Sequence, residues 1–518
     1  MRKGAADAVI HARTEQHQVV RARRDRGNEG QSDERRDVHW VTLGILANYA
    51  NSQLAIPVSA TTSTSEIEFV EAISAWIPES DGPVRASLTV AIRQAIISGR
   101  LASGSRLPPE RVLAKALHVS RPTVSGVIED LRRGGFVSSR QGSGTWVSAT
   151  SAPRDEPVPF VEMIQADGCI DLAAATASDA SWLPPMRVET ADLLMVDPSN
   201  GLIPQGLRQL RETVAQRAAA QVDGTTAANV ITTSGAHQAL ALVVATIAPR
   251  GSTVLVEDTT FGGLVDIVLA AGCHPVGIPR DDDGPVPEVL TELVRRHSPS
   301  LVVLVSSVHS PTGTISSVDR CRELTNVLAD APTQVVLDET YADLEFTPSG
   351  RPLSVALGND VIRVGSLSKT LWSGLRTGWI IAPIDTCLAI ARRRWKQFDL
   401  GPSVASQLFA LQALEGIEGR IAERCSALRG RYAWLRDALT EAFPDWQLTP
   451  VDGGLAMWVE VPGDGAEFAT LAAANGVAVL PGSACRADRE PTPHIRICFD
   501  RPMEVLENSI ERLQAMPG

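Results

Sequence analysis

The 518-residue sequence has few cysteines, few aromatic residues and no long apolar run. Its seven cysteines are scattered, without a C-x-x-C pair or the His/Cys spacing of a zinc site, which argues against a disulfide framework and a bound metal. No apolar run reaches the roughly 20 residues that a transmembrane helix needs, and the Arg-rich N-terminus has no secretory apolar core. We therefore expect a cytoplasmic protein with reduced thiols, no metal and no membrane partner.

Positive charge is also scarce in the chain as a whole, but it is unevenly distributed. The net charge is −12, which excludes a general binder of polyanions. Between Asp81 and Val147, however, ten Lys/Arg residues stand against four Asp/Glu. A chain of this length, of which 44% is hydrophobic, is expected to form two or more domains. The basic block therefore marks one domain of an otherwise acidic protein.

Residues 1–72 are predicted to be a disordered N-terminal extension. Met1–Asp37 is polar and highly charged, and Ser59–Ser65 is rich in Ser and Thr. Such a composition cannot bury enough apolar surface to fold. A basic arm that contacts DNA is the alternative, but the acidic residues nearly cancel the arginines.

The basic block has the pattern of a winged helix-turn-helix, an α+β domain that we place at residues 73–148. Apolar spacing and turn residues predict three helices and then two short strands, Ser87–Ile97, Glu110–Leu117, Arg121–Arg133, Phe136–Ser139 and Thr145–Val147. Ser120 is a good N-cap for the third helix. In this fold the second helix braces the DNA backbone, and the third enters the major groove.

Five residues of this domain are candidates for contact with DNA. Arg121 opens the third helix, where it can reach a guanine edge or a phosphate, and Ser120 and Thr123 lie in the same turn. Arg111 opens the second helix, and Gly142 allows the tip of the hairpin to approach DNA closely. A small helical domain with merely solvated arginines is the alternative.

The order and spacing of these residues resemble the DNA-binding domain of the GntR regulators over about seventy residues. The resemblance rests on the segments Gly104–Arg111, Val119–Val124 and Gly142–Thr145. It implies operator contacts by four of the candidates, Arg111, Arg121, Thr123 and Gly142. The family often has a threonine where this chain has Pro122, so we expect that contact to be absent.

Residues 149–165 are a linker by composition, because Ser, Pro and charged residues dominate. At about 3.3 Å per residue, an extended linker of this length spans about 50 Å, so the modules are tethered. Residues 166–518 alternate strands and helices in an α/β pattern, with a smaller α+β subdomain at roughly 390–518. Four nearly continuous apolar runs predict buried strands, Val254–Glu257, Leu301–Val305, Val335–Asp338 and Val361–Val364.

A lysine lies in an unusual setting within Val364–Trp379. Lys369 follows an apolar run and is surrounded by small hydroxyl residues and glycines, so we expect it to be buried. Burial favours the neutral amine, which is the form that makes Schiff bases. The hydroxyls of Ser366 and Ser368, together with Arg376, can hold a phosphate beside it. The alternative is a structural loop with a solvent-seeking lysine.

Other candidate ligand contacts follow predicted strands. Gly235, Ala236 and His237 open a helix whose free N–H groups and dipole can hold a phosphate. Many helix starts look similar, and His237 is expected to act through its backbone. Phe261 can stack on a flat ring, although a position in the core explains it equally well. Ser310 lies in a turn after a buried strand.

Three residues with acidic, phenolic or basic side chains complete the set. Asp338 ends a buried strand and needs a partner, such as a protonated pyridine nitrogen. Tyr341 follows closely enough to bond a phenolic oxygen on the same ring. Arg496 lies in an apolar strand, where a ligand carboxylate is a suitable counter-ion and a structural Arg–Asp pair is the alternative.

Taken together, these residues resemble the fold-type I pyridoxal phosphate aminotransferases over about 350 residues. The resemblance implies that Lys369 forms a Schiff base with the cofactor, that Asp338 pairs with the ring nitrogen and that Tyr341 bonds the ring oxygen. It also implies that Phe261 stacks on the ring and that Arg496 receives the α-carboxylate of an amino acid.

The same resemblance assigns the cofactor phosphate to Ser366, Arg376 and the turn at Gly235–His237. Two departures from the family matter. The family's Asn before Pro-Thr-Gly, which bonds the ring, is Ser310 here. The aromatic residue that the partner subunit usually contributes is Leu202. Both changes can leave cofactor binding intact and weaken turnover.

A winged helix ahead of an aminotransferase-like domain is the plan of the MocR subfamily of GntR regulators, which the sequence resembles in both halves. The resemblance implies a transcriptional regulator that binds operator DNA and senses pyridoxal phosphate or a small amino compound. It further implies a head-to-tail homodimer with at most residual aminotransferase activity. An active aminotransferase that carries a DNA-binding domain is the competing hypothesis, because the catalytic set is largely complete.

Overall fold

The computed structural model describes most of the chain from residue 69 onward. The described residues are 69–70, 72–73, 84–97, 100–101, 104–133, 136–140, 144–147, 159–164, 168–177, 180–196, 200–329 and 331–516. The predicted extension, residues 1–72, lies almost entirely outside them, as do Gly142 and most of the predicted linker. The expectations for those segments therefore stay predictions.

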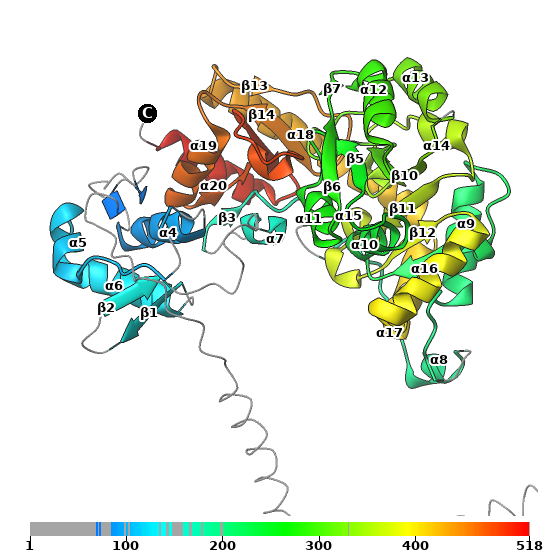
Figure 1. Ribbon diagram of the computed structural model, residues 1–518, viewed down its shortest axis with the longest axis horizontal. Coiled ribbons are helices and arrows are strands. Elements are labelled where there is room, and N and C mark those ends of the chain that lie inside the picture. Colours follow the sequence, from blue (N-terminus) through cyan, green and yellow to red (C-terminus); the bar gives the residue numbers. More distant parts are fainter. Residues whose placement is uncertain are drawn as a thin grey trace, which may run out of the picture. The chain divides into compact units, whose positions relative to one another are not determined.

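The first described domain has the predicted order of helices and strands (Figure 1). Its elements are α4 (Val84–Ile97), α5 (Glu110–Ala116), α6 (Arg121–Arg133), β1 (Val137–Arg140) and β2 (Gly144–Val147). The two strands pair antiparallel, with Val137 opposite Val147. Ser120 is the predicted N-cap of α6, because its Oγ accepts the Thr123 N–H at 3.2 Å. The predicted winged helix-turn-helix is thus confirmed within the described residues.

A core of its own holds this domain together. In α6, Val124, Val127, Ile128 and Leu131 are all buried, and their spacing gives the helix one apolar face. They belong to one cluster with residues of α4, α5 and both strands. On its polar side, α6 is tied to α4 by Arg85, whose Nε and Nη2 each lie 2.7 Å from the Asp130 carboxylate.

A seven-stranded sheet forms the centre of the second domain, in the order β4-β12-β11-β10-β9-β5-β6. The strands are β4 (Val230–Thr233), β5 (Thr253–Glu257), β6 (His274–Ile278), β9 (Leu301–Val305), β10 (Gln334–Asp338), β11 (Ile362–Ser366) and β12 (Gly378–Ile381). All neighbouring pairs are parallel except those of β12, which is antiparallel to both neighbours. The four apolar runs predicted as buried strands are β5, β9, β10 and β11, so that prediction is confirmed.

Helices cover both faces of this sheet. One face carries α10 (Ala236–Ile247), α11 (Gly262–Ala270) and α16 (Ile384–Gln397). The other carries α12 (Pro287–His297), α13 (Val318–Ala329), α14 (Pro352–Leu357), α9 (Arg208–Ala219) and α17 (Val404–Leu414). Successive strand residues alternate between the faces, so Val303 joins the first core and Leu304 the second. The α/β fold class is confirmed.

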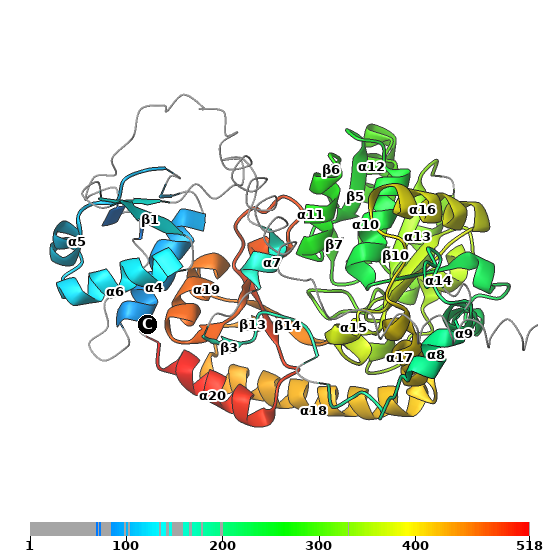
Figure 2. The same ribbon diagram turned by 90° about the horizontal axis from the view of Figure 1, so that it is seen from below.

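A four-stranded antiparallel sheet and three helices build the smaller subdomain. The strands run in the order β13 (Gln447–Leu448), β14 (Ala456–Glu460), β17 (His494–Cys498) and β16 (Leu480–Pro481). The helices are α18 (Ile417–Ala442), α19 (Gly465–Ala474) and α20 (Met503–Gln514). Figure 2 shows α18 extending from this subdomain toward the large sheet.

The packing differs from the predicted boundaries in two places. The predicted subdomain starts near residue 390, but Ile390 and Ala391 of α16 pack in the core of the large sheet. Conversely, β3 (Ile170–Asp171) pairs with β15 (Val477–Ala478), which adds an early segment to the subdomain. The pairing of β3 with β15 joins segments about three hundred residues apart, so no local sequence pattern could predict it.

The end of the predicted linker is also structured. Phe160 begins the short helix α7 (Phe160–Met163), its ring is buried, and its backbone N–H donates to Asp266 Oδ2 at 2.6 Å. The other described elements are α8 (Thr190–Leu194), α15 (Leu367–Thr370), β7 (Arg280–Asp281) and β8 (Gly284–Pro285). In the part of the chain that the structure describes, no helix has the length and apolar character to cross a bilayer.

Candidate functional site

The candidate DNA-contacting residues lie on the outside of the winged-helix domain. Arg121 is the first residue of α6, and 70% of its side chain is exposed, with its Nε 4.0 Å from Glu110 Oε2. Arg111 is exposed on α5. The hydroxyls of Ser120 and Thr123 lie 2.7 Å apart, so each is partly used in capping the helix. The exposed arginines are free to reach a phosphate or a base edge.

The base of the wing adds one residue that the sequence reading missed. Arg106 is exposed and forms a β-bridge with Trp146, and its guanidinium lies 5.7 Å from the centre of the Trp146 ring. Gly144 has a φ of +103°, and a Cβ there would lie 2.7 Å from Arg106 Nε. The sequence signal that could have identified Arg106 is its position directly before Leu107-Pro108-Pro109 in the basic block.

In the second domain, Lys369 and Asp338 meet at the carboxyl ends of neighbouring parallel strands. Asp338 is the last residue of β10, in register with Val364 of β11, and Lys369 follows β11 on α15. Ligands of open α/β sheets bind at this edge. The Lys369 Nζ donates to the Ala175 carbonyl at 2.7 Å and lies 5.7 Å from the centre of the Tyr341 ring.

Burial makes the Lys369 amine a good nucleophile. Desolvation, together with the nearby charge of Arg496, lowers the pKa of Lys369 to about 8, although the Asp338 carboxylate opposes the shift. A lysine with this pKa has an appreciable neutral fraction at physiological pH. The neutral amine is the form that attacks a carbonyl.

Asp338 and Tyr341 lie beside Lys369, and we call the site that these residues form with Arg496 the cofactor cleft. Burial raises the pKa of Asp338, whose Oδ1 accepts the Thr340 N–H at 2.8 Å. Burial also raises the pKa of Tyr341, although Ser310 partly opposes the shift, and the Tyr341 hydroxyl donates to the Ala175 carbonyl at 3.4 Å. A cationic partner would relieve the desolvation of Asp338.

Three segments converge into a cup suited to a phosphate. Gly235, with a φ of +122°, is the N-cap of α10, and a Cβ there would lie 3.8 Å from both Nη atoms of Arg376 and from Ser368 Oγ. Ser366 caps α15, since its Oγ accepts the Ser368 N–H at 3.1 Å. Gly378 permits this approach, because a Cβ there would lie 2.8 Å from the Gly235 backbone. The first N–H groups of α10 have no acceptor within the helix and can bind an anion.

His237 and Phe261 form an aromatic border beside this cup. Their ring centres are 6.3 Å apart in an edge-to-face arrangement, and Phe261 also packs edge-to-face on Phe160 at 5.1 Å. Burial lowers the pKa of His237, which favours the neutral imidazole. Phe261 is half-buried at the start of α11, so one part of the ring belongs to the core.

Arg496 has the setting of a receptor for a carboxylate. Its side chain lies in β17 and is only 3% exposed, and Nη2 donates to the Ala173 carbonyl at 2.6 Å. Its Nε has no hydrogen-bond acceptor, and none of the described Asp or Glu residues forms an ion pair with it. The alternative of a structural Arg–Asp pair is therefore not seen among the described residues. A ligand carboxylate would balance this charge.

The segment 171–176 lines the cleft through its backbone, and the sequence reading missed it. Arg501 holds this segment in place, because its guanidinium donates to the carbonyls of Asp171, Ala174 and Thr176 at 2.6, 2.8 and 3.2 Å. The carbonyls that face Lys369 and Arg496 belong to alanines, whose side chains carry no chemical signal. The available signal was Arg501 itself, a second arginine after an apolar strand.

A buried polar cluster supports the loop that carries Ser310, and it too was missed. Glu257 lies 3.3 Å from both Arg280 Nε and His309 Nε2, and burial raises the pKa of Glu257 to about 7. Desolvation lowers the pKa of His309 well below its usual value, so its ring is neutral. Its Nε2 lies 2.9 Å from the Thr259 carbonyl, which fits a donated hydrogen bond.

These features fit pyridoxal phosphate. The cleft combines a lysine with a lowered pKa, a phosphate cup, and a buried carboxylate and a buried guanidinium that have no ion-pair partner within the described residues. Each corresponds to one group of the cofactor or of an amino acid joined to it. Among the candidate residues, only Gly142 falls outside the described part of the chain.

Both domains of the chain match known protein families. Residues 169–513 match the family of class I and II aminotransferases, and residues 85–147 match the gntR family of bacterial regulatory proteins. The HTH-type transcriptional regulator TauR of Rhodobacter capsulatus is 27% identical over 449 residues, which cover 78% of this chain and 90% of TauR. The HTH-type pyridoxine biosynthesis transcriptional regulator PdxR of Corynebacterium glutamicum is 26% identical over 401 residues, which cover 73% of this chain and 83% of PdxR.

Solved structures agree on the fold of the second domain. LysN, an α-aminoadipate aminotransferase from Thermus thermophilus solved with a phosphopyridoxyl-leucine, superposes with a TM-score of 0.60 at 22% identity. The match covers 69% of this chain and 94% of LysN. The chain therefore belongs to the class I and II aminotransferase family, whose cofactor is pyridoxal phosphate, and with a gntR-type domain ahead of it has the architecture of the MocR subfamily of transcriptional regulators.

Proposed function

We propose that this regulator binds pyridoxal phosphate through Lys369 and responds to the cofactor or to a small amino compound held beside it. The observation that carries the proposal is the pairing, in one buried cleft, of an amine with a pKa of about 8 and an arginine without a counter-ion. The first suits the cofactor aldehyde, and the second suits the carboxylate of an amino acid.

Each residue of the cleft has a distinct part in holding the cofactor. The Lys369 amine would hold the cofactor through its aldehyde carbon. Asp338 would hold a proton on the ring nitrogen, and Tyr341, with Ser310 nearby, would donate toward the ring oxygen. Phe261 would pack on the ring. When bound, pyridoxal phosphate withdraws electrons from bonds at the amino-bearing carbon.

The phosphate is held by the cup at the other end of the cleft. The backbone N–H groups of Gly235, Ala236 and His237 and the Arg376 guanidinium can donate to it. Ser366 is proposed to shape the cup, because its hydroxyl accepts the Ser368 N–H and donates to the Thr377 carbonyl. These donors would keep the cofactor in place independently of Lys369. The neutral Lys369 amine would then be available to move a proton.

The response to an effector is proposed to depend on Arg496. A carboxylate bound there would pull on Nη2, which also bonds the Ala173 carbonyl in the segment that faces Lys369. Binding of an amino compound would thus rearrange the 171–176 segment. A change of this kind can alter how two winged helices are spaced on DNA half-sites.

On the DNA side, Arg121 and Thr123 are proposed to read the major groove from the start of α6. Ser120 fixes that turn, and Arg111 contacts the DNA backbone. Gly142 is proposed to bring the wing tip to the adjacent backbone.

We also propose a head-to-tail homodimer. Three large apolar side chains are exposed in the single chain: Leu194 at the end of α8, Met195 directly after it, and Trp395 on α16. Groups of this kind usually mark a protein interface. Sedimentation of the full chain at several concentrations tests the dimer, and a monomer at micromolar concentration would contradict it.

An active aminotransferase is the second candidate, because the residues that hold the cofactor and a substrate carboxylate occupy one cleft. Against efficient turnover stand Ser310, which offers the ring oxygen a hydroxyl in place of an amide, and Leu202, which is 47% exposed and cannot bond a phosphate. Many turnovers of amino acid and keto acid per protein molecule would favour the enzyme.

Chemical trapping tests the cofactor proposal directly. Borohydride reduction of the holo protein should fix the cofactor on one lysine, and mass spectrometry of the digest should locate it on the peptide that contains Lys369. An adduct on Lys115 or Lys396, or no adduct, would contradict the proposal. In parallel, the affinity of the holo protein for DNA flanking its own gene should change when a panel of amino acids is added.

A further inference from the structure

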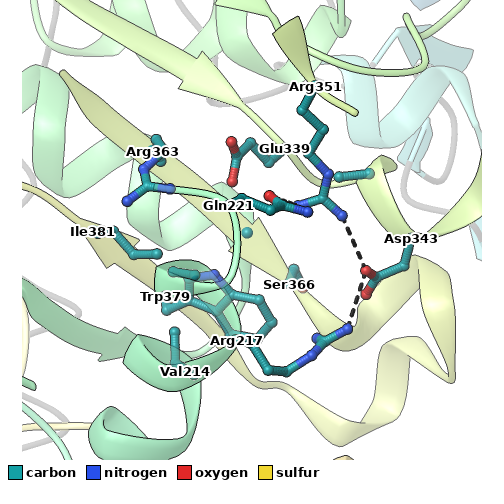
Figure 3. A pocket seen from close by; sticks show the side chains of 13 residues that line it. Val214, Arg217, Gln221, Glu339, Asp343, Arg351, Arg363, Ser366, Trp379 and Ile381 are labelled. Atoms are coloured by element: carbon teal, nitrogen blue, oxygen red, sulfur yellow. Dashed lines mark hydrogen bonds and ion pairs between the residues drawn. The ribbon is translucent and has the colours of Figure 1, made fainter. Parts of the chain in front are cut away.

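A cavity lies on the sheet face that α9 covers, and among the residues assigned to the cofactor it shares only Ser366 (Figure 3). Its volume, counted as the space open to the centres of water molecules, is about 70 Å³. That is room for several waters or for one small ligand. The Ser366 hydroxyl is engaged elsewhere, since it donates to the Thr377 carbonyl at 3.1 Å and caps α15. The cavity is therefore a separate feature from the cofactor cleft.

Three arginines from distant parts of the sequence line this cavity. The side chain of Arg217 on α9 is 27% exposed, that of Arg351 before α14 is 17% exposed, and Arg363 of β11 is only 1% exposed. Their guanidinium groups therefore range from the mouth of the cavity to its floor. Two carboxylates, Asp343 and Glu339, also line it. The lining therefore has three cations and two anions, and Arg217 Nε also lies 3.7 Å from Glu418 Oε1, an exposed carboxylate outside the lining.

The ion pairs at the mouth are poorly satisfied. Arg217 Nη2 and Arg351 Nη2 both point at the same atom, Asp343 Oδ1, and both lie 3.3 Å from it (Figure 3). Strong charge-assisted hydrogen bonds are about 2.7–2.9 Å long. One carboxylate oxygen is thus shared by two cations, and each guanidinium has N–H groups left for another acceptor. Arg351 donates one of these N–H groups, from Nη1, to Gln221 Oε1 at 3.1 Å.

Arg363 on the floor has no carboxylate partner among the described residues. Its Nη2 reaches only neutral acceptors, Thr225 Oγ1 at 3.1 Å and Asn359 Oδ1 at 3.5 Å, and its Nε has none. Burial lowers the pKa of Arg363, although Glu339 partly opposes this effect. A buried guanidinium without a bonded counter-ion is costly, and an anion in the cavity would balance it.

We propose that this cavity binds a small organic carboxylate. The planar forks of Arg217 and Arg351 match the two oxygens of a carboxylate, and the charge of Arg363 attracts it from the floor. Val214, Ile381 and Trp379 supply an apolar wall for the carbon chain. Inorganic phosphate would match the guanidinium groups but leave this wall without a partner.

The cavity also has a direct contact with the helix that carries Lys369. Thr370 Oγ1 donates to Asp343 Oδ2 at 3.4 Å, and Thr370 follows Lys369 in α15. A carboxylate that draws Arg217 and Arg351 away from Asp343 would strengthen this second contact. The binding itself does not depend on the proposed cofactor, whereas this coupling rests on it.

Thermal unfolding of the full chain as its Lys369→Ala variant, without cofactor, tests the binding. Sodium propionate, sodium phosphate and sodium chloride are compared at equal ionic strength. Propionate should raise Tm by about 2–4 °C, and the rise should follow the logarithmic dependence on ligand concentration that binding to one site gives. Arg217→Gln and Arg351→Gln, which change partly exposed side chains, should each raise the dissociation constant fitted from that dependence about tenfold. Arg187→Gln, in an exposed pair with Glu189 away from the cavity, should leave it unchanged.

A further variant separates the cavity from the cofactor cleft, because Arg496 can also receive a carboxylate. If Arg496→Gln abolishes the propionate effect and Arg217→Gln does not, the carboxylate binds in the cleft and the proposal is overturned. A larger rise of Tm with phosphate than with propionate overturns the ligand class, and equal rises with all three salts overturn a specific site. Because the test uses Lys369→Ala, failure of the cofactor proposal leaves its outcome unchanged.

Discussion

In the winged-helix domain, the arginines that are expected to contact DNA are exposed to solvent, whereas the charged residues of the cofactor cleft are buried. Most of the Arg121 side chain is exposed, but Arg496 is 3% exposed and Lys369 is desolvated enough to lower its pKa to about 8. Exposed cations gain affinity by releasing counter-ions from DNA, which makes binding sensitive to salt. Enclosed groups act through desolvation and direct contact, and salt screens them much less.

The largest effect is expected in the cleft. Lys369→Ala should abolish the absorbance of the Schiff base completely, because no other lysine of the described residues lies beside Asp338. The matched control is Lys396→Ala, since Lys396 is exposed on α16. Absorbance spectra with excess cofactor make the measurement. Retention of the band in Lys369→Ala would show that another amine carries the cofactor.

The next largest effect is expected on the surface of the winged helix. Arg121→Ala should weaken operator binding about 10–100-fold and reduce the salt dependence of the affinity, because a contact worth 1–3 kcal/mol is removed. Fluorescence anisotropy with labelled operator at several salt concentrations measures both.

Arg132→Ala, at the other end of α6, is the control for this change, and cofactor uptake should be the same in all three proteins. If Arg121→Ala and Arg132→Ala weaken DNA binding equally, the start of α6 has no special role. If Arg121→Ala also loses the cofactor, the two surfaces are not separable in the way the structure indicates.

The same contrast explains what could be predicted from the sequence. The winged helix was predictable because its signals are local: Ser120 caps the helix that Arg121 opens, and the apolar spacing of α6 lies within thirteen residues. In the cleft, Lys369 and Asp338 were predictable because each follows a run that reads as a buried strand, and such strands end at one edge of a sheet.

The other contacts of the site could not be predicted. They depend on backbone carbonyls far away in the sequence, or on side chains that come together only in the folded protein. The carbonyl that accepts from Lys369 belongs to Ala175, and a carbonyl leaves no trace in the residue type. Arg217, Arg351 and Arg363 meet at one cavity only after α9 packs on the sheet. Each of them alone is an ordinary arginine in the sequence. Arg501 could be noticed in the sequence, but the carbonyls that it holds in the 171–176 segment lie more than three hundred residues away.

A smaller effect distinguishes the enclosed amine from an exposed one by its pH dependence. The rate of cofactor uptake should rise with pH and level off above about 8, because only the neutral Lys369 amine reacts and its pKa lies there. Below that value the rate should fall about tenfold per pH unit, with the neutral fraction. Stopped-flow absorbance measures it. A midpoint near 10, the ordinary range of lysine, would show that Lys369 is not desolvated in solution.

The smallest effect is expected at Ser310, where the cleft departs from the aminotransferase pattern. Ser310 lies near enough to Tyr341 to oppose the rise in the Tyr341 pKa, and the Tyr341 hydroxyl is expected at the ring oxygen. Ser310→Asn offers the ring a longer donor, so cofactor affinity should rise about 2–10-fold, which corresponds to one hydrogen bond of 0.5–1.5 kcal/mol. Equilibrium dialysis measures it, with Ser310→Ala as the partner variant. If both variants bind the cofactor as the unchanged protein does, Ser310 does not face the ring, and the weak point of the cleft lies elsewhere.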